Sequence, residues 1–161
     1  MMRILYLTLA LAFSPSSHAQ DSATLFSATL SGLDDQPVAL SRWKGKPLIV
    51  NFWARWCTPC RTEIPVLVKL RGQLKNQGLE VLGIGLEDKA EPIRDFAKVY
   101  EMDYPVLLAK DKGFELMKSL GNTKMGLPFT VLINPNGKLT LIKMGIIKPD
   151  ELTVAAMAIL P

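Results

Sequence analysis

The fold is decided by the stretch Trp53-Ala54-Arg55-Trp56-Cys57-Thr58-Pro59-Cys60, which holds both cysteines of the chain. The stretch follows an apolar run, Leu48-Ile49-Val50, and leads into a segment with helical periodicity. Two thiols separated by two residues at a strand-to-helix junction can close as a disulfide. When open, they provide one exposed nucleophile and one resolving thiol. The spacing therefore predicts a redox-active pair.

The segments on either side of the cysteines predict a parallel pair of strands joined by a helix. Residues 48–54 form an apolar strand of the kind that is buried on both faces of a sheet. A helix is expected from about Thr58 to Gln77, with Gly78 as the residue that ends it. Residues 79–86 form a second apolar strand, and the crossover between the two strands should be right-handed.

The rest of the chain continues the alternation of strands and helices. Residues 25–40 contain a turn and a short edge strand, which makes an N-terminal extension. The later expected elements are a helix from about Glu91, a strand at 104–108, a helix at 113–120, a hairpin of strands 129–133 and 138–144, and a helix from Pro149. The fold class is α/β, with a mixed sheet flanked by helices.

The N-terminus has the pattern of a secretory signal peptide. Arg3 precedes an apolar stretch at 4–13, and Ser17-His18-Ala19 fits a cleavage site. We expect residues 1–19 to be removed and residues 20–161 to form one domain in the periplasm, with an uncleaved inner-membrane anchor as the alternative. Small domains in an oxidising compartment that depend on structural disulfides have many cysteines. This chain has a single pair, which indicates a catalytic rather than a structural disulfide.

Composition excludes several classes of function. The net charge is +4, with no run of five or more like charges, so a nucleic-acid partner is not expected. The only histidine, His18, lies in the expected signal peptide. The mature protein would therefore lack Ser-His-Asp catalysis, Cys-His catalysis and histidine-bound zinc. No metal site and no cofactor are expected.

The two cysteines should differ in reactivity. Cys57 is expected at the loop–helix junction, where the helix dipole is worth about 0.3–1 kcal/mol and charge-assisted hydrogen bonds about 1.5–3 kcal/mol. Together these effects lower the pKa of the Cys57 thiol by about one to three units. Cys60, in the first helical turn, is the resolving thiol, and Pro59 tunes the pair by removing a backbone donor.

A second element, Met125-Gly126-Leu127-Pro128-Phe129, precedes a predicted core strand. Proline cannot donate to the sheet, and the X–Pro bond has a low cis penalty of about 0.5–1 kcal/mol. Pro128 is therefore a candidate cis-proline.

These motifs together resemble the thioredoxin superfamily. The residues that carry the resemblance are 52–60, Pro65 and Gly126-Leu127-Pro128. The sequence is more closely similar to the secreted TlpA/ResA branch, which includes the cytochrome c maturation thioredoxins, through Asn51, Glu63, Pro65 and a long crossover after Leu86. The resemblance implies a thioredoxin fold with an N-terminal strand or hairpin extension and an inserted helix–strand segment.

The resemblance also assigns roles to residues. It implies that Cys57 is the nucleophile, that Cys60 resolves, and that Pro128 is the cis-proline beside them. The backbone of Leu127 would then pair with the backbone of a substrate. Trp56 is either a substrate contact or packing at the rim of the site.

The group that moves protons should differ from that of thioredoxin itself. Asn51 stands where thioredoxins carry a buried aspartate, and an amide cannot shuttle protons. Glu87 falls where ResA-like proteins place a glutamate, so it is a candidate general base, with a solvated loop acid as the alternative. Glu63 is expected to bond the helix start or a neighbouring lysine.

The leading hypothesis is an exported, monomeric thiol–disulfide oxidoreductase that acts as a reductant in exchange with protein partners, with cytochrome c maturation as a candidate pathway. Its electrons would come from a membrane-embedded thiol donor. The alternatives are a Cu(I) carrier that uses Cys57 and Cys60 as soft ligands, a disulfide-forming oxidase, and a peroxidase related to peroxiredoxins. Peroxiredoxins use a single peroxidatic cysteine in a different motif, so peroxide turnover should be poor.

Overall fold

The computed structural model describes residues 22–161. The predicted signal peptide and its cleavage site lie outside the described residues. Within residues 22–161, no helix combines the length and apolar character needed to cross a membrane.

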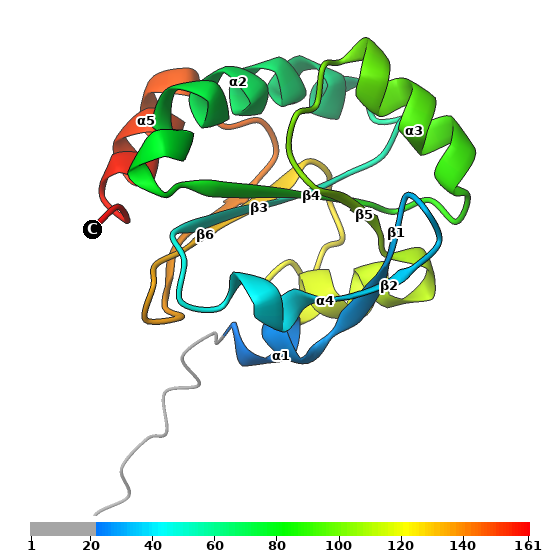
Figure 1. Ribbon diagram of the computed structural model, residues 1–161, viewed down its shortest axis with the longest axis horizontal. Coiled ribbons are helices and arrows are strands. Elements are labelled where there is room, and N and C mark those ends of the chain that lie inside the picture. Colours follow the sequence, from blue (N-terminus) through cyan, green and yellow to red (C-terminus); the bar gives the residue numbers. More distant parts are fainter. Residues whose placement is uncertain (1–21) are drawn as a thin grey trace, which may run out of the picture.

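A seven-stranded mixed sheet forms the centre of the molecule, in the order β2-β1-β5-β4-β3-β6-β7 (Figure 1). Its strands are β1 (Thr29–Gly32), β2 (Pro37–Ala39), β3 (Leu48–Trp53), β4 (Glu80–Gly85), β5 (Val106–Leu108), β6 (Phe129–Ile133) and β7 (Leu139–Met144). β3 pairs with β4 in parallel and with β6 antiparallel. The hairpin of β1 and β2 occupies one edge through an antiparallel pairing of β1 with β5.

Helices cover both faces of the sheet, as Figure 1 shows. One face carries α2 (Thr58–Leu74), α3 (Ala90–Val99) and α5 (Pro149–Met157), and the other carries α1 (Ala23–Ser27) and α4 (Gly113–Ser119). Short 3-10 turns lie at Leu40–Trp43, Lys75–Gln77 and Lys110–Lys112. Each layer encloses its own hydrophobic cluster, and the α2 layer contains both cysteines.

The central elements form for the reasons that the sequence predicts. All six residues of β3 are buried, as a strand covered on both faces requires. The helix after it places Cys60, Ile64, Leu67 and Leu70 on its buried side at intervals of three or four residues. Gly78 ends this segment with φ 92°, a left-handed conformation that favours glycine.

The observed elements confirm the predicted α/β class and the thioredoxin fold with its N-terminal hairpin and inserted α3–β5 segment. The start of the described chain contains a helix that was not expected, because the sequence predicts only a turn and a short edge strand over residues 25–40 and α1 begins at Ala23. Leu25 and Phe26 of α1 are buried in the cluster beneath the sheet. This packing stabilises a helix of five residues, which would be too short to be stable on its own.

Candidate active site

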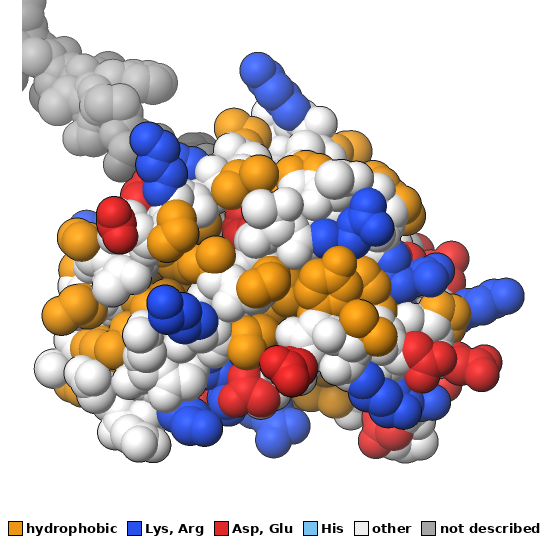
Figure 2. All heavy atoms as spheres, turned by 90° about the horizontal axis from the view of Figure 1, so that it is seen from above, with side chains coloured by type: hydrophobic (Ala, Val, Ile, Leu, Met, Phe, Trp, Pro, Cys, Tyr) orange, Lys and Arg blue, Asp and Glu red, His pale blue; other side chains and the backbone are white. Residues whose placement is uncertain are grey.

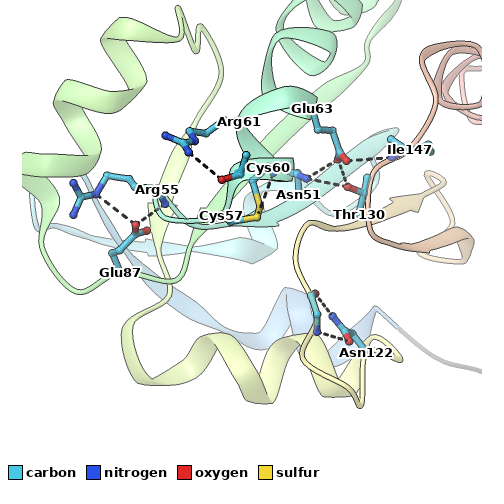
Figure 3. The surroundings of a disulfide bond; sticks show 12 residues. Asn51, Arg55, Cys57, Cys60, Arg61, Glu63, Glu87, Asn122, Thr130 and Ile147 are labelled. Atoms are coloured by element: carbon cyan, nitrogen blue, oxygen red, sulfur yellow. Dashed lines mark hydrogen bonds and ion pairs between the residues drawn. A yellow bond between two sulfur atoms is a disulfide. The ribbon is translucent and has the colours of Figure 1, made fainter.

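Cys57 and Cys60 form a disulfide where β3 passes into α2 (Figure 3). Their Cα atoms are 5.3 Å apart. Cys57 is the N-cap of the helix, and its Sγ accepts a hydrogen bond of 3.2 Å from the backbone N–H of Cys60. Cys57 is 5% exposed and Cys60 is 1% exposed. Cys57 therefore lies at the positive end of a long helix and is slightly more exposed than Cys60.

A tight turn brings the chain from the strand to the cysteines. The backbone N–H of Cys57 donates to the carbonyl of Ala54 at 3.1 Å. Pro59 follows within the first two positions of α2, where the missing N–H would have no partner inside the helix. Arg61 donates to Oγ1 of Thr58 at 3.0 Å across the first turn of α2.

The loop that carries Pro128 meets the same end of the sheet. Phe129 pairs with Phe52 of β3, so Pro128 lies level with the point where β3 leaves for the cysteines. The Leu127–Pro128 peptide bond is cis, as the sequence predicts. The side chain of Leu127 is half-buried and packs against the cluster that contains both cysteines. The backbone carbonyl of Pro128 accepts from Gly145 at 2.8 Å, which fixes the loop to the end of β7.

A buried carboxylate, that of Glu63, lies one helical turn after Cys60 on the same buried side of α2. Its Oε1 accepts from Nδ2 of Asn51 at 3.0 Å and from Oγ1 of Thr130 at 2.8 Å. Its Oε2 accepts from the backbone N–H of Ile147 at 3.2 Å. Burial raises the pKa of Glu63, and the hydrogen bonds from Thr130 and Ile147 oppose that rise.

The expectation that Glu63 bonds the helix start or a neighbouring lysine is wrong. Its hydrogen bonds instead join α2 to β3, to β6 and to the segment before α5. The signal in the sequence was its position three residues after Cys60, on the face that the helical period assigns to the core.

Glu87 follows β4 and faces the turn before Cys57 (Figure 3). Its Oε1 accepts from the backbone N–H of Arg55 at 2.7 Å and lies 3.4 Å from Nε of the same residue. Its Oε2 is buried and has no hydrogen-bond partner among the described residues. Burial raises the pKa of Glu87, and the hydrogen bond and charge of Arg55 oppose that rise. With 13% of its side chain exposed, Glu87 is not a solvated loop acid.

The two tryptophans of the motif have different environments. Trp53 is fully buried and stacks on Phe96 of α3, with ring centroids 4.9 Å apart. Trp56 is 71% exposed, next to Cys57 in the chain. The exposed indole of Trp56 therefore lies on the surface beside the disulfide, whereas that of Trp53 is part of the core.

The surface around the motif is shallow. Figure 2 shows the helical face, where apolar side chains gather between lysines, arginines and acids. A hollow of about 560 Å³ on this face is lined by Arg55, Arg61, Pro92, Phe96 and Val99, among others. A larger hollow of about 690 Å³, at α1 and the 135–137 turn, is lined by no residue of the motif. Within the described residues, no group of three or more His, Cys, Asp or Glu is placed to hold a metal ion.

Comparison with known proteins gives a consistent result. Residues 19–142 match the AhpC/TSA family. The chain is 32% identical over 110 residues to the thiol-disulfide oxidoreductase ResA of Bacillus thuringiensis subsp. konkukian, covering 68% of this chain and 61% of that protein. The ResA of Bacillus subtilis is 31% identical over 116 residues, covering 72% and 63%. The chain thus spans less than two thirds of the length of these relatives.

Solved structures share the fold. A secreted Mycobacterium tuberculosis disulfide oxidoreductase homologous to E. coli DsbE superposes with a TM-score of 0.72 at 20% identity, covering 84% of this chain and 98% of that one. A thiol:disulfide interchange protein of the thioredoxin family from Chlorobium tepidum gives 0.73 at 25% identity, with coverage of 84% and 94%.

Proposed function

Because the chain belongs to the AhpC/TSA family and has a thioredoxin fold, we propose that it is a protein thiol–disulfide oxidoreductase that works through Cys57 and Cys60. The observation that carries this proposal is the disulfide at the N-terminus of α2. A thiolate at Cys57 is stabilised by the helix dipole and by the N–H of Cys60, whereas Cys60 is sealed in the core.

The exchange proceeds in two steps that balance in electrons and protons. The Cys57 thiolate attacks one sulfur of a partner disulfide, the partner S–S bond breaks, and the released partner thiolate takes a proton from solvent. Cys60 then loses its proton and attacks Sγ of Cys57, which releases the second partner thiolate. Two electrons pass from the dithiol to the partner, and the Cys57–Cys60 disulfide remains.

Glu87 is the proposed acceptor of the Cys60 proton. Its Oε2 has no hydrogen-bond partner within residues 22–161, and burial raises its pKa, so the carboxylate holds a proton more readily than an exposed glutamate does. Its hydrogen bonds go to Arg55, and none among the described residues joins it to a sulfur, so the transfer requires a bridging water or a small movement in the reduced protein.

The substrate-binding roles follow from the surface beside the disulfide. Leu127 offers its backbone to an extended partner segment, with Pro128 ending the loop. Trp56 contacts apolar side chains of the partner that neighbour the partner's cysteine. Pro59 is exposed between Cys57 and Cys60 and contacts the same part of the partner.

We propose that the direction is reductive and the compartment periplasmic. The named relatives are thiol-disulfide oxidoreductases called ResA, and one structural neighbour is secreted and homologous to DsbE. In this scheme a membrane-embedded thiol donor reduces Cys57–Cys60, the protein acts as a monomer, and cytochrome c maturation is the candidate pathway.

The test of this proposal is trapping of partners by the Cys60→Ser variant, expressed in full length, with Cys57→Ser as the matched control. Cys60→Ser should accumulate mixed disulfides through Cys57, and Cys57→Ser should not. A trapped cytochrome or cytochrome assembly factor supports maturation, whereas a broad set of secreted proteins indicates a general disulfide-forming or reducing role. Absence of any trapped partner, with turnover of hydrogen peroxide or tight Cu(I) binding by the reduced protein, would replace the proposal by a peroxidase or a copper carrier.

A further inference from the structure

The loop before Pro128 is held closed by one buried side chain, that of Asn122 (Figure 3). Nδ2 of Asn122 donates to the backbone carbonyl of Gly126 at 2.8 Å. The backbone N–H of Gly126 donates back to Oδ1 of Asn122 at 3.3 Å. The amide therefore uses its donor and its acceptor on the same residue, and it is 0% exposed.

The end of α4 fixes Asn122 in turn. The N–H of Gly121 donates to the carbonyl of Lys118, and the N–H of Asn122 donates to the carbonyl of Met117. This pair of bonds is a Schellman motif, and Gly121 has the left-handed φ of 103° that the motif needs. Asn122 is thus anchored to a helix through its backbone and to the loop through its side chain.

The loop that Asn122 closes includes a strained residue. Met125 has φ 56°, a left-handed conformation that is unfavourable for any residue other than glycine. Its side chain is 47% exposed. Such a conformation persists only where surrounding contacts impose it. The bonds from Asn122 to the next residue, Gly126, are the described side-chain contacts that do so.

We propose that Asn122 is a positioning residue for partner binding: by clamping Gly126, it fixes the backbone of Leu127 for pairing with an extended partner segment. This inference rests on the proposed exchange function. Leu127 directly follows the clamped residue, and on its other side the loop is tied by the bond between Gly145 and Pro128. Without the clamp, the bond from Gly145 and the packing of the Leu127 side chain remain, but the backbone that precedes Leu127 must be ordered when the partner binds.

The test compares two disulfides that differ in backbone. One is a symmetrical disulfide dimer of an extended, uncharged pentapeptide with a central cysteine, and the other is bis(2-hydroxyethyl) disulfide, which has no peptide group. The ratio of kcat/KM for the peptide to kcat/KM for the small disulfide reports backbone pairing and cancels changes in thiolate reactivity. In Asn122→Ala this ratio should fall about tenfold, through KM, because binding must now order the loop.

Thr123→Ala is the matched control, because Thr123 lies exposed in the same loop and has no described side-chain hydrogen bond. Its ratio should stay within about twofold of the wild type. A pentapeptide N-methylated beside the cysteine should lose its advantage with the wild type and change little with Asn122→Ala.

A second variant gives a pH-dependent rescue and covers the case in which Asn122→Ala does not fold. In Asn122→Asp, a protonated carboxyl has one donor and one acceptor, as the amide does, whereas the ionised form only accepts. The ratio should therefore approach the wild-type value near pH 4 and fall toward the Asn122→Ala value near pH 8. A structural role without effect on partner binding would not produce this profile.

Two outcomes overturn the inference in different ways. If both variants keep the wild-type ratio at every pH, Asn122 does not position the partner, and the exchange function stands. If the wild-type protein reduces neither disulfide, the proposed function fails, and the inference fails with it.

Discussion

Two acidic side chains lie on either side of the disulfide in the view of Figure 3, and they are held in opposite ways. Both oxygens of Glu63 accept hydrogen bonds, from Asn51, Thr130 and Ile147. Glu87 accepts from Arg55 through one oxygen, and its other oxygen has no hydrogen-bond partner in the part of the chain that the structure describes. Burial raises the pKa of both, so the pKa direction alone does not distinguish them. The number of oxygens that accept hydrogen bonds does distinguish them. Glu63 joins elements of the fold, whereas the second oxygen of Glu87 is available for the proton that we propose it accepts.

The largest expected effect is on stability. Glu63→Ala leaves buried donors on three different elements unsatisfied and should lower the free energy of unfolding by about 3 kcal/mol. Glu87→Ala removes bonds to one residue and should lower it by about 1 kcal/mol. Urea unfolding of the oxidised proteins at pH 7 measures both values. Equal decreases in the free energy of unfolding of the two variants would contradict the different structural roles of Glu63 and Glu87.

The next effect is on the resolving step. Glu87→Gln cannot accept a proton, so release of a partner from its mixed disulfide should slow about tenfold at neutral pH, and the defect should shrink as pH rises and Cys60 ionises unaided. Rapid mixing of the reduced protein with a fluorescent peptide disulfide separates attack from release. Glu63→Gln serves as the comparison and should change the release rate less than about threefold. If Glu63→Gln gave the larger change, the roles of the two residues would be exchanged.

A smaller effect concerns the pH dependence of stability. The pKa of Glu63 is raised in the folded protein above the ordinary value of 4.5, so the folded state binds the proton more tightly than the unfolded chain. The stability linked to this group is therefore present below about pH 4.5 and is lost as pH rises through the native pKa. The difference in unfolding free energy between wild type and Glu63→Gln, measured in a pH series, should change with that sign. A difference independent of pH would show that Glu63 titrates normally.

The smallest effect is expected for Arg55→Gln. The Arg55 side chain is 45% exposed, so its ion pair with Glu87 is screened by water and adds little to stability. Because Arg55 lowers the pKa of Glu87, its loss should raise that pKa further and move the Glu87-dependent part of the release step to higher pH. The pH–rate profile of release measures the shift, and Arg61→Gln on the same surface is the control. A shift to lower pH would contradict the assignment.

The same comparison shows what a sequence can predict here. β3, α2 and β6 were predictable because unbroken apolar runs and a helical period define them locally. The cysteine pair and the candidate cis-proline were visible as short motifs. The environment of Glu63 was not, because two of its partners, Thr130 and Ile147, lie 67 and 84 residues away. The hydrogen bonds between Asn122 and Gly126 could not be predicted for a related reason, because their geometry depends on how α4 ends. Tertiary contact, rather than local pattern, decides which polar residues near the site are satisfied.

The most direct test of the account is the reactivity of the two thiols in the reduced protein. Pulses of iodoacetamide across a pH series, read by mass spectrometry of the peptides that contain Cys57 and Cys60, give a rate and an apparent pKa for each thiol. We predict that Cys57 reacts faster at neutral pH, with a pKa about one to three units below the ordinary value of about 8.5. Equal rates for the two thiols at every pH, or faster reaction of Cys60, would contradict the assignment of Cys57 as the attacking thiol.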